Sequence, residues 1–159
     1  MKTFNTQHKY FARLSMVCKS VAEKETSTLR SQIKVDNKHI VATDRKRLAC
    51  LDNFGLSNGR YIVHKCTKNE IVLISVEPVG IFPQNIGDLS PDICDDVKFC
   101  LGHDLSIAHY CIAKQGACLS IPYLKDYMAA DKYHVISPTH PVLFYAKEFI
   151  AVIMPMNVN

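Results

Sequence analysis

The 159-residue sequence lacks the features that mark membrane-spanning and secreted proteins. No apolar run approaches the roughly 18 to 20 residues that a membrane-spanning helix needs. The start of the chain, MKTFNTQHKYFARL, interrupts its apolar residues with polar ones throughout, so it has no apolar core of a signal peptide. These absences predict a soluble, cytoplasmic protein with no membrane partner.

Motifs of several enzyme classes are also missing. The sequence has no glycine-rich phosphate loop, no His-Glu-x-x-His zinc motif and no Gly-x-Ser-x-Gly nucleophile elbow. A Cys/His nucleophile stays open as an alternative, because seven cysteines and seven histidines are present and no pair stands out. We therefore expect a protein that is not an enzyme and that carries no cofactor.

The seven cysteines raise two further possibilities, disulfide bonds and a metal site. Their number is odd and they lie inside apolar runs such as RLACLD, which favours reduced core thiols. The densest group of potential metal ligands has only Cys100-x2-His103 and His109-x-Cys111 as close pairs, whereas zinc sites typically use Cys-x2-Cys. The group comprises Cys94, Cys100, His103, His109, Cys111 and Cys118. We expect no metal, and a metal-dependent enzyme is the remote alternative.

The composition that is present is typical of one folded domain, which we place at residues 1–159. Hydrophobic residues make up 48% of the chain and charged residues 21%, enough to form a core without metal or disulfide crosslinks. The net charge of +4 by itself supports an anionic partner only weakly.

The segment 8–25, HKYFARLSMVCKSVAEKE, has the spacing of an amphipathic helix. The residues expected on its apolar side are Tyr10, Phe11, Leu14, Val17, Cys18 and Val21. The residues expected on its outer, basic side are Lys9, Arg13, Met16, Ser20 and Lys24.

Period-two patterns predict strands through most of the remaining chain. TLRSQIKV and NKHIVATD form a hairpin that turns at Asp36-Asn37, and RLACLD, RYIVHKC and EIVLISVE follow. After the Pro- and Gly-containing connector 78–92, DVKFCLG and DLSIAHYCIA are predicted as strands. Ser120 then caps a short helix in IPYLKDYMAADK, before strands YHVIS, PVLFYAK and EFIAVIMPM. Whether the chain starts with a strand or with the helix is open, and halves at about 1–80 and 93–159 suggest an internal duplication.

Three of these stretches resemble the bacterial DNA sliding clamps, the beta subunit of DNA polymerase III. HIVATDRKRLACL is similar to the clamp strand that commonly reads Ala-Thr-Asp-Gly-His-Arg-Leu-Ala, with Arg45 and Lys46 in place of Gly-His. AVIMPMNV is similar to the family's terminal Val-Val-Met-Pro-Met-Arg-Leu, with Asn157-Val158 in place of Arg-Leu. IFPQ resembles the Phe-Pro that links the middle and last clamp domains.

The resemblance implies an α+β fold, a DNA-clamp-like domain of two βαβββ halves with the helices on one face of antiparallel sheets. A clamp chain has three such domains and dimerises into a ring of six, whereas this sequence predicts one domain. In clamps the two longer motifs come from neighbouring domains. Here they meet either within one fold or between protomers of a head-to-tail homo-oligomer.

The resemblance also implies a hydrophobic pocket that accepts peptides from replication or repair proteins. Methionine suits such a pocket because it adapts to differing apolar ligands. The alternative is a last strand whose methionines pack into the core. The implied pocket residues are Thr43, Arg47, Leu48, Val152, Met154, Pro155 and Met156.

A DNA-facing surface is the third implication, in which cations contact phosphates without reading bases. The alternative is an ordinary solvated helix face, and Asp126 and Asp131 lower the charge near the second helix. The implied residues are Lys9, Arg13 and Lys24, with Lys125 and Lys132 as counterparts on the second helix.

Together these features predict a sliding-clamp-like accessory protein of DNA replication or repair. It would bind partner peptides through the pocket and assemble as a homo-oligomer around double-stranded DNA. The alternative is a protein-interaction module or clamp mimic that never encircles DNA and captures or blocks clamp partners.

Overall fold

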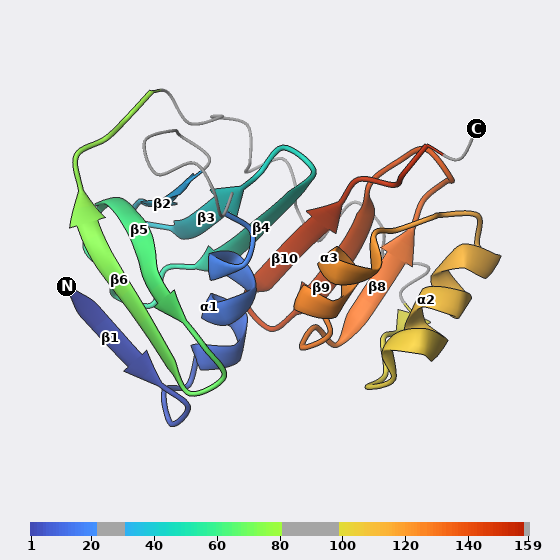
Figure 1. Cartoon of the computed structure of the whole chain (residues 1–159), viewed down its shortest axis with the longest axis horizontal. Coiled ribbons are helices and arrows are strands. Elements are labelled where there is room, and N and C mark those ends of the chain that lie inside the picture. Colours follow the sequence, from blue (N-terminus) through green and yellow to red (C-terminus); the bar gives the residue numbers. More distant parts are fainter. Residues whose placement is uncertain (22–30, 81–98, 158–159) are drawn as a thin grey trace.

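A computed structural model of the chain describes residues 1–21, 31–80 and 99–157. The elements are β1 (Lys2–Asn5), α1 (Phe11–Cys18), β2 (Gln32–Val35), β3 (His39–Thr43), β4 (Arg47–Asp52), β5 (Gly59–Cys66), β6 (Glu70–Val76), β7 (Phe99–Cys100), α2 (Leu105–Lys114), α3 (Ile121–Asp126), β8 (Lys132–Val135), β9 (Val142–Ala146) and β10 (Phe149–Ile153). Within the described residues the strands form one antiparallel sheet in the order β1-β6-β5-β2-β3-β4-β10-β9-β8-β7. Figure 1 shows α1 and α3 in front of this sheet and α2 beside α3.

The strand order divides the sheet into two similar halves. The first half contains β1, α1, β2, β3 and β4, and the second contains β7, α2, α3, β8, β9 and β10. In the β3–β4 hairpin Ala42 pairs with Ala49, and in the β9–β10 hairpin Phe144 pairs with Ala151, the same register displaced by 102 residues. The hairpins join where Ala49 pairs with Ala151 across β4 and β10. The predicted α+β fold of two βαβββ halves is confirmed.

One hairpin has no counterpart in the second half. Strands β5 and β6 pair with each other and lie between β1 and β2, whereas β7 pairs directly with β8. Of the predicted connector, residues 78–80 belong to no helix or strand, and residues 81–92 lie outside the described residues. The boundaries of the halves near 80 and 93 therefore stay predictions.

The strand predictions of the first half are confirmed where the structure describes them, and residues 28–30 of the predicted strand TLRSQIKV lie outside the described residues. Strand β4 covers the whole of RLACLD. The chain starts with a strand, β1, rather than with the helix. At the β2–β3 turn, Asp36 Oδ1 accepts hydrogen bonds from the backbone amides of Lys38 at 2.9 Å and His39 at 2.8 Å. This side-chain capping of backbone donors explains why aspartate favours the turn.

The prediction of a strand over DLSIAHYCIA is wrong, because this segment is α2. Asp104 caps the helix by accepting a hydrogen bond from the Ile107 amide at 2.9 Å. Ala108 and Ile112, four residues apart, are buried, whereas Ile107 and Tyr110 are exposed. Apolar residues on both sides of this helix produced the period-two pattern.

Helix α1 is confirmed over Phe11–Cys18, but its expected outer side is wrong at two positions. Met16 and Ser20 are fully buried, because the second half of the chain covers this side of the helix. Ser20 Oγ lies 2.5 Å from the hydroxyl oxygen of Tyr127, the residue that immediately follows α3. The expected apolar side is buried at Leu14, Val17, Cys18 and Val21.

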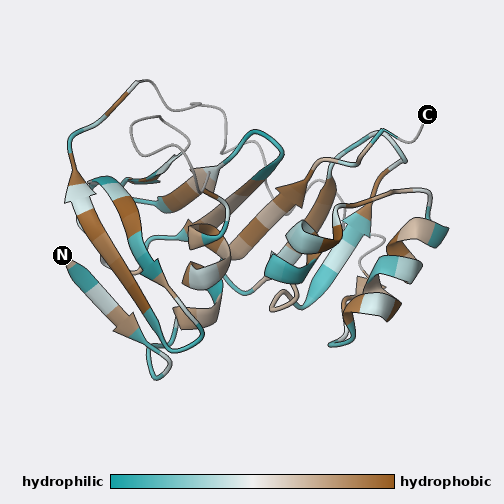
Figure 2. Cartoon of the chain, in the orientation of Figure 1, coloured by the Kyte–Doolittle hydropathy of each residue, from teal (hydrophilic) through white to brown (hydrophobic). Residues whose placement is uncertain are grey.

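One hydrophobic core extends through both halves of the molecule. It joins residues of α1, α2 and α3 to the sheet residues that face them, including Ala49 and Ala151 at the junction of the hairpins. Figure 2 shows apolar residues along the strands of both halves, including β5, β6 and β10. The two halves are thus packed as one body rather than as separate units.

Candidate functional site

The two motifs that carry the predicted pocket are neighbours within a single chain. Strand β10 pairs with β4, and Val152 lies opposite Leu48 while Ile153 lies opposite Arg47. Immediately after β10, the backbone amide of Met154 donates a hydrogen bond to the carbonyl of Lys46 at 2.8 Å. Formation of this site requires no second copy of the chain.

The segment Met154-Pro155-Met156 is held at both ends. Beyond the Lys46 contact of Met154, the amide of Met156 donates to the carbonyl of Cys118 at 2.7 Å. Pro155 lies between them and has no N–H group that would need a partner. The segment therefore spans from the β3–β4 turn to the loop before α3, and 44% of Met154 and 48% of Met156 remain exposed. The alternative, in which these methionines pack into the core, is wrong.

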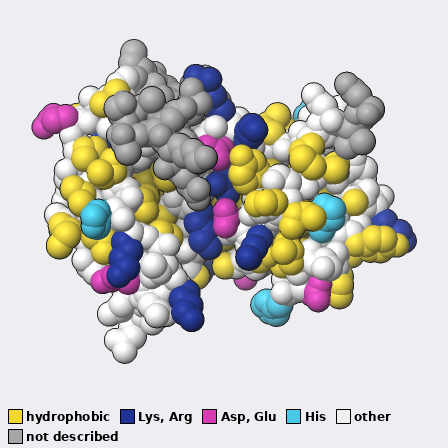
Figure 3. Space-filling view, in the orientation of Figure 1, with side chains coloured by type: hydrophobic (Ala, Val, Ile, Leu, Met, Phe, Trp, Pro, Cys, Tyr) yellow, Lys and Arg dark blue, Asp and Glu magenta, His cyan; other side chains and the backbone are white. Residues whose placement is uncertain are grey.

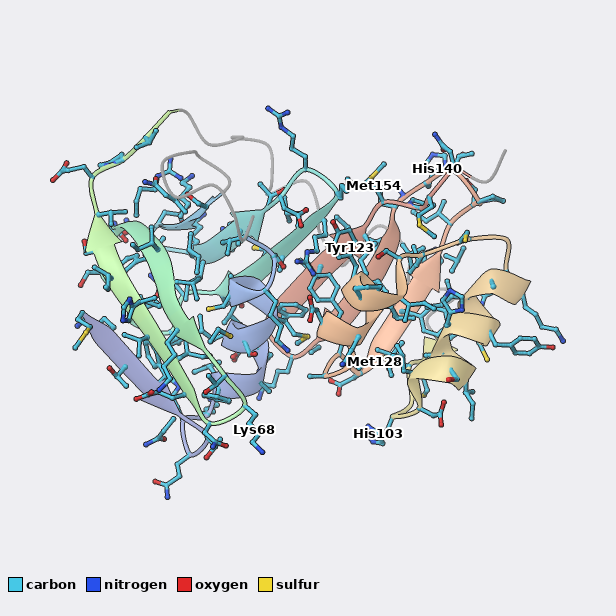
Figure 4. The ribbon with its side chains drawn as sticks, viewed as in Figure 1. Lys68, His103, Tyr123, Met128, His140 and Met154 are labelled. Atoms are coloured by element: carbon cyan, nitrogen blue, oxygen red, sulfur yellow. The ribbon has the colours of Figure 1, made fainter. Side chains whose placement is uncertain are left out.

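A hollow of about 320 Å³ lies along this segment. Tyr123 comes from α3, and Figure 4 shows it on the same side of the molecule as Met154. Aromatic and methionine side chains give the hollow an apolar wall that can adapt in shape. The lining residues are Lys46, Ser120, Tyr123, Met154, Pro155 and Met156.

Arg47 lies beneath the hollow and does not line it. Its side chain is only 6% exposed, and it donates to Asp44 Oδ2 at 2.9 Å and to Asp126 Oδ2 at 2.6 Å. Its guanidinium carbon is 4.3 Å from the centre of the Tyr123 ring. Burial acts to lower the pKa of Arg47, but the two carboxylates outweigh it and raise that pKa. Arg47 thus positions Tyr123 and joins β4 to α3.

Thr43, Leu48 and Val152 also lie outside the lining of the hollow. The Thr43 hydroxyl donates to the Arg47 carbonyl at 2.8 Å and stabilises the β3–β4 turn. Leu48 and Val152 pack on the opposite face of the sheet, in a small cluster with Leu143 and Tyr145. Of the seven predicted pocket residues, the structure brings Met154, Pro155 and Met156 into the hollow.

Sequence reasoning missed Lys46, Ser120 and Tyr123 as lining residues. Lys46 lies inside the recognised motif, at a position where clamps commonly have histidine. Ser120 does hold the N-cap position of α3, as predicted, but its side chain makes no capping hydrogen bond and instead lines the hollow. The sequence gives no signal for Tyr123. This residue is brought beside the motif only by the pairing of strands that are far apart in the sequence.

The predicted DNA-facing residues that the structure describes do not all lie on one face of the sheet. Arg13 donates to the Lys147 carbonyl at 2.6 Å and lies 3.9 Å from Glu148, so its charge is already engaged. Lys132 is on β8 rather than on a helix, and since its neighbour Tyr133 faces the core, Lys132 points to the opposite face of the sheet. Lys24 lies outside the described residues, whereas Lys9 and Lys125 are exposed. On the helix face, Lys and Arg are interspersed with acidic and apolar side chains (Figure 3).

No group of three or more metal-ligating side chains is close enough to hold a metal ion in the part of the chain that the structure describes. Cys94, a member of the candidate metal cluster, lies outside that part. The described cysteines are free thiols. Within the same residues, no helix is long and apolar enough to cross a membrane.

Comparison of the structure with solved structures finds the bacterial sliding clamps. The chain matches the pol III beta protein of Caulobacter crescentus with a TM-score of 0.60 at 12% identity, covering 98% of this chain and 65% of that one. It matches the DNA polymerase sliding clamp of Pseudomonas aeruginosa with a TM-score of 0.58 at 12% identity, covering 98% and 66%. For the beta subunit of Thermotoga maritima the TM-score is 0.56 at 12% identity, with 99% and 64% covered.

These matches show that the chain has the sliding-clamp fold. The chain spans just under two thirds of the length of the clamp chains that it matches. No protein-family model matches the sequence, and no curated protein is significantly similar to it.

Proposed function

Because the chain has the fold of bacterial sliding clamps, we propose that it is a clamp-like accessory protein of DNA replication or repair. It binds short apolar peptides of its partner proteins in the hollow beside Met154-Pro155-Met156. The function is non-catalytic, since binding needs an apolar wall and fixed backbone groups rather than a nucleophile or a general base.

The observation that carries this proposal is the junction of the two motifs at one hollow. The turn that contains Lys46 and the segment that contains Met154 are joined by a hydrogen bond, and both line the same hollow. The segment is anchored at both ends by backbone hydrogen bonds while its methionine side chains remain exposed. Such side chains are suited to ligand contact, because the backbone needs no rearrangement before binding.

The first test is the affinity for a peptide of the clamp-binding type, Gln-Leu-Ser-Leu-Phe, measured by fluorescence anisotropy with a labelled peptide. We expect saturable binding, and we expect Met154→Glu to weaken it by about 30-fold, the effect of losing a binding hot spot of about 2 kcal/mol. Met154 lies beyond the end of β10 and is half-exposed, so this change should leave the fold intact.

The matched control is Ile107→Glu. Ile107 is an exposed apolar residue on α2 that does not line the hollow, so the same charge change there should leave peptide affinity unaltered. Failure of the unaltered protein to bind the peptide would exclude the proposed site. Equal affinity for Met154→Glu and the unaltered protein would exclude it as well.

Assembly of a homo-oligomeric ring around double-stranded DNA is the second candidate function. Exposed Lys9 and Lys125 near the ends of α1 and α3 favour it, whereas the engaged Arg13 contributes no free charge. Sedimentation at low salt should then give the mass of a closed ring. A separate binding assay should show DNA binding that weakens with salt and does not depend on the DNA sequence. A monomer that still binds the peptide would instead support a non-encircling clamp mimic that captures or blocks clamp partners.

A further inference from the structure

The hollow beside the Met154-Pro155-Met156 segment carries one cation and no anion. Lys46 is the single charged residue among the side chains that line it, and the others are apolar or neutral. Lys46 is exposed, and within the described residues no carboxylate lies within ion-pair distance of its ammonium group. Lys19, by comparison, lies 3.9 Å from Asp126.

Arg47 explains why the two nearby carboxylates, Asp44 and Asp126, do not pair with Lys46. Asp44 accepts hydrogen bonds from the Arg47 side chain and from the backbone amides of Lys46 and Arg47, at 2.9, 3.0 and 2.9 Å. Asp126, from α3, receives the second nitrogen of Arg47 at 2.6 Å. Arg47 and Lys19 thus place two cations beside the two carboxylates beneath the hollow, which leaves the charge of Lys46 available to a ligand.

The backbone of Lys46 is fixed on both sides. Its amide is bound by Asp44, and its carbonyl accepts from the Met154 amide at 2.8 Å. Across the same hollow, the Ser120 hydroxyl makes no capping hydrogen bond with α3. An ammonium group and a hydroxyl group are therefore presented beside an apolar wall of Tyr123 and the two methionines, and both are donors that a carboxylate accepts.

We propose that Lys46 and Ser120 make the hollow selective for peptides that carry a carboxylate next to their apolar residues. This inference rests on the proposed peptide-binding function and adds the chemical class of its partner. The carboxylate comes either from an acidic side chain or from the C-terminus of the peptide, and both present the same two oxygen acceptors to Lys46.

The test compares four labelled peptides that share the Gln-Leu-Ser-Leu-Phe core. One ends in an amide, one in a free carboxylate, one in Asp-amide and one in Asn-amide. At low salt, one of the two acidic peptides should bind about 5-fold more tightly than its neutral counterpart, the effect of a partly exposed ion pair of about 1 kcal/mol. Preference for Asp-amide identifies an internal acidic residue, and preference for the free acid identifies a C-terminal carboxylate.

Two variants test whether the preference for acidic peptides comes from Lys46 or from the overall positive charge of the protein. Lys46→Gln should reduce the ratio of acidic to neutral affinity to about one, and high salt should reduce it in the unaltered protein. Lys68→Gln, in the β5–β6 turn and far from Met154 in Figure 4, should keep the ratio. Equal binding of acidic and neutral peptides, or a ratio that survives Lys46→Gln, overturns the inference while the proposed function stands. Binding of none of the four overturns both.

Discussion

Cys66, at the end of β5, is a free thiol as its sequence context suggested, but its pKa is not that of an ordinary cysteine. It is half-buried, and its Sγ lies 3.6 Å from the Ser15 hydroxyl of α1. A hydrogen bond from Cys18 lowers the pKa of the Cys66 thiol to about 6, although partial burial opposes this shift. The pKa of Cys18 is correspondingly raised. The thiolate form of Cys66 is therefore favoured relative to that of an ordinary cysteine.

The rate at which iodoacetamide alkylates Cys66 tests this assignment, because the thiolate is the reactive form. A folded pKa below the ordinary value keeps the thiolate populated down to lower pH. Peptide mapping by mass spectrometry should give a half-maximal rate near pH 6, against about 8.5 for an ordinary cysteine.

Cys18→Ala removes the donor and supplies the control for Cys66. In this variant the half-maximal rate should move up toward the ordinary pH, because the thiolate loses its main stabilising contact. A midpoint above pH 8 in the unaltered protein would contradict the hydrogen bond between the two cysteines.

At the scale of elements, α1 differs from a typical surface helix because both of its sides are covered. The sheet covers one side, and Tyr127 of the second half covers the other. Met16, on the side predicted to face solvent, is 1% exposed. Met16→Ala should lower the free energy of unfolding by about 3 kcal/mol, the cost of removing a buried methionine, as measured by urea denaturation.

Met154→Ala is the matched control for Met16→Ala, since it makes the same chemical change at a half-exposed position. We expect it to alter the free energy of unfolding by less than about 0.5 kcal/mol. Equal effects of the two changes would restore the interpretation of α1 as a surface helix with a solvated outer side.

The elements with strict local patterns could be predicted from the sequence, and those that depend on distant contacts could not. Strand β4 and the turn at Asp36 follow from alternation and from the preference of aspartate for turns. The outer side of α1 could not be predicted, because its cover comes from Tyr127, more than a hundred residues later in the chain. Helix α2 was missed because the segment was assigned from its period-two pattern alone, without regard to the N-cap that Asp104 provides.

The same division holds for the candidate site. The Met154-Pro155-Met156 segment was found from its resemblance to clamps, and it does line the hollow. Arg47 was expected in the pocket, but an arginine beside Asp44 in the turn and opposite Asp126 of α3 becomes buried between them. Such an ion pair depends on tertiary packing, to which a single sequence gives no access.

For the whole molecule, the pairing of β4 with β10 makes the two halves interdependent. Three polar contacts reinforce this junction in addition to the shared core. They are Arg47 with Asp126, Ser20 with Tyr127, and Arg13 with the carbonyl of Lys147. Each joins a residue of the first half to a residue of the second, so we expect the halves to unfold together.

Arg47→Met tests this cooperativity, because it removes the cation while keeping most of the side-chain volume. Asp44 and Asp126 are then left without their shared buried partner, which should cost about 3 kcal/mol of unfolding free energy. Urea denaturation followed by circular dichroism and by tyrosine fluorescence should give one coincident transition, shifted to lower urea for both probes. Since β4 belongs to one half and α3 to the other, loss of this contact destabilises the whole molecule.

Lys19→Met separates this effect from the loss of any positive charge near Asp126. The Lys19 ammonium group lies 3.9 Å from the same carboxylate but is 43% exposed, so its removal should cost less than about 1 kcal/mol. If Arg47→Met splits the denaturation curve into two transitions, the halves are stable separately and the sheet junction is only a contact between them. If both variants shift a single transition equally, the stabilisation comes from the surface charge of α3 rather than from burial of Arg47 beneath the hollow.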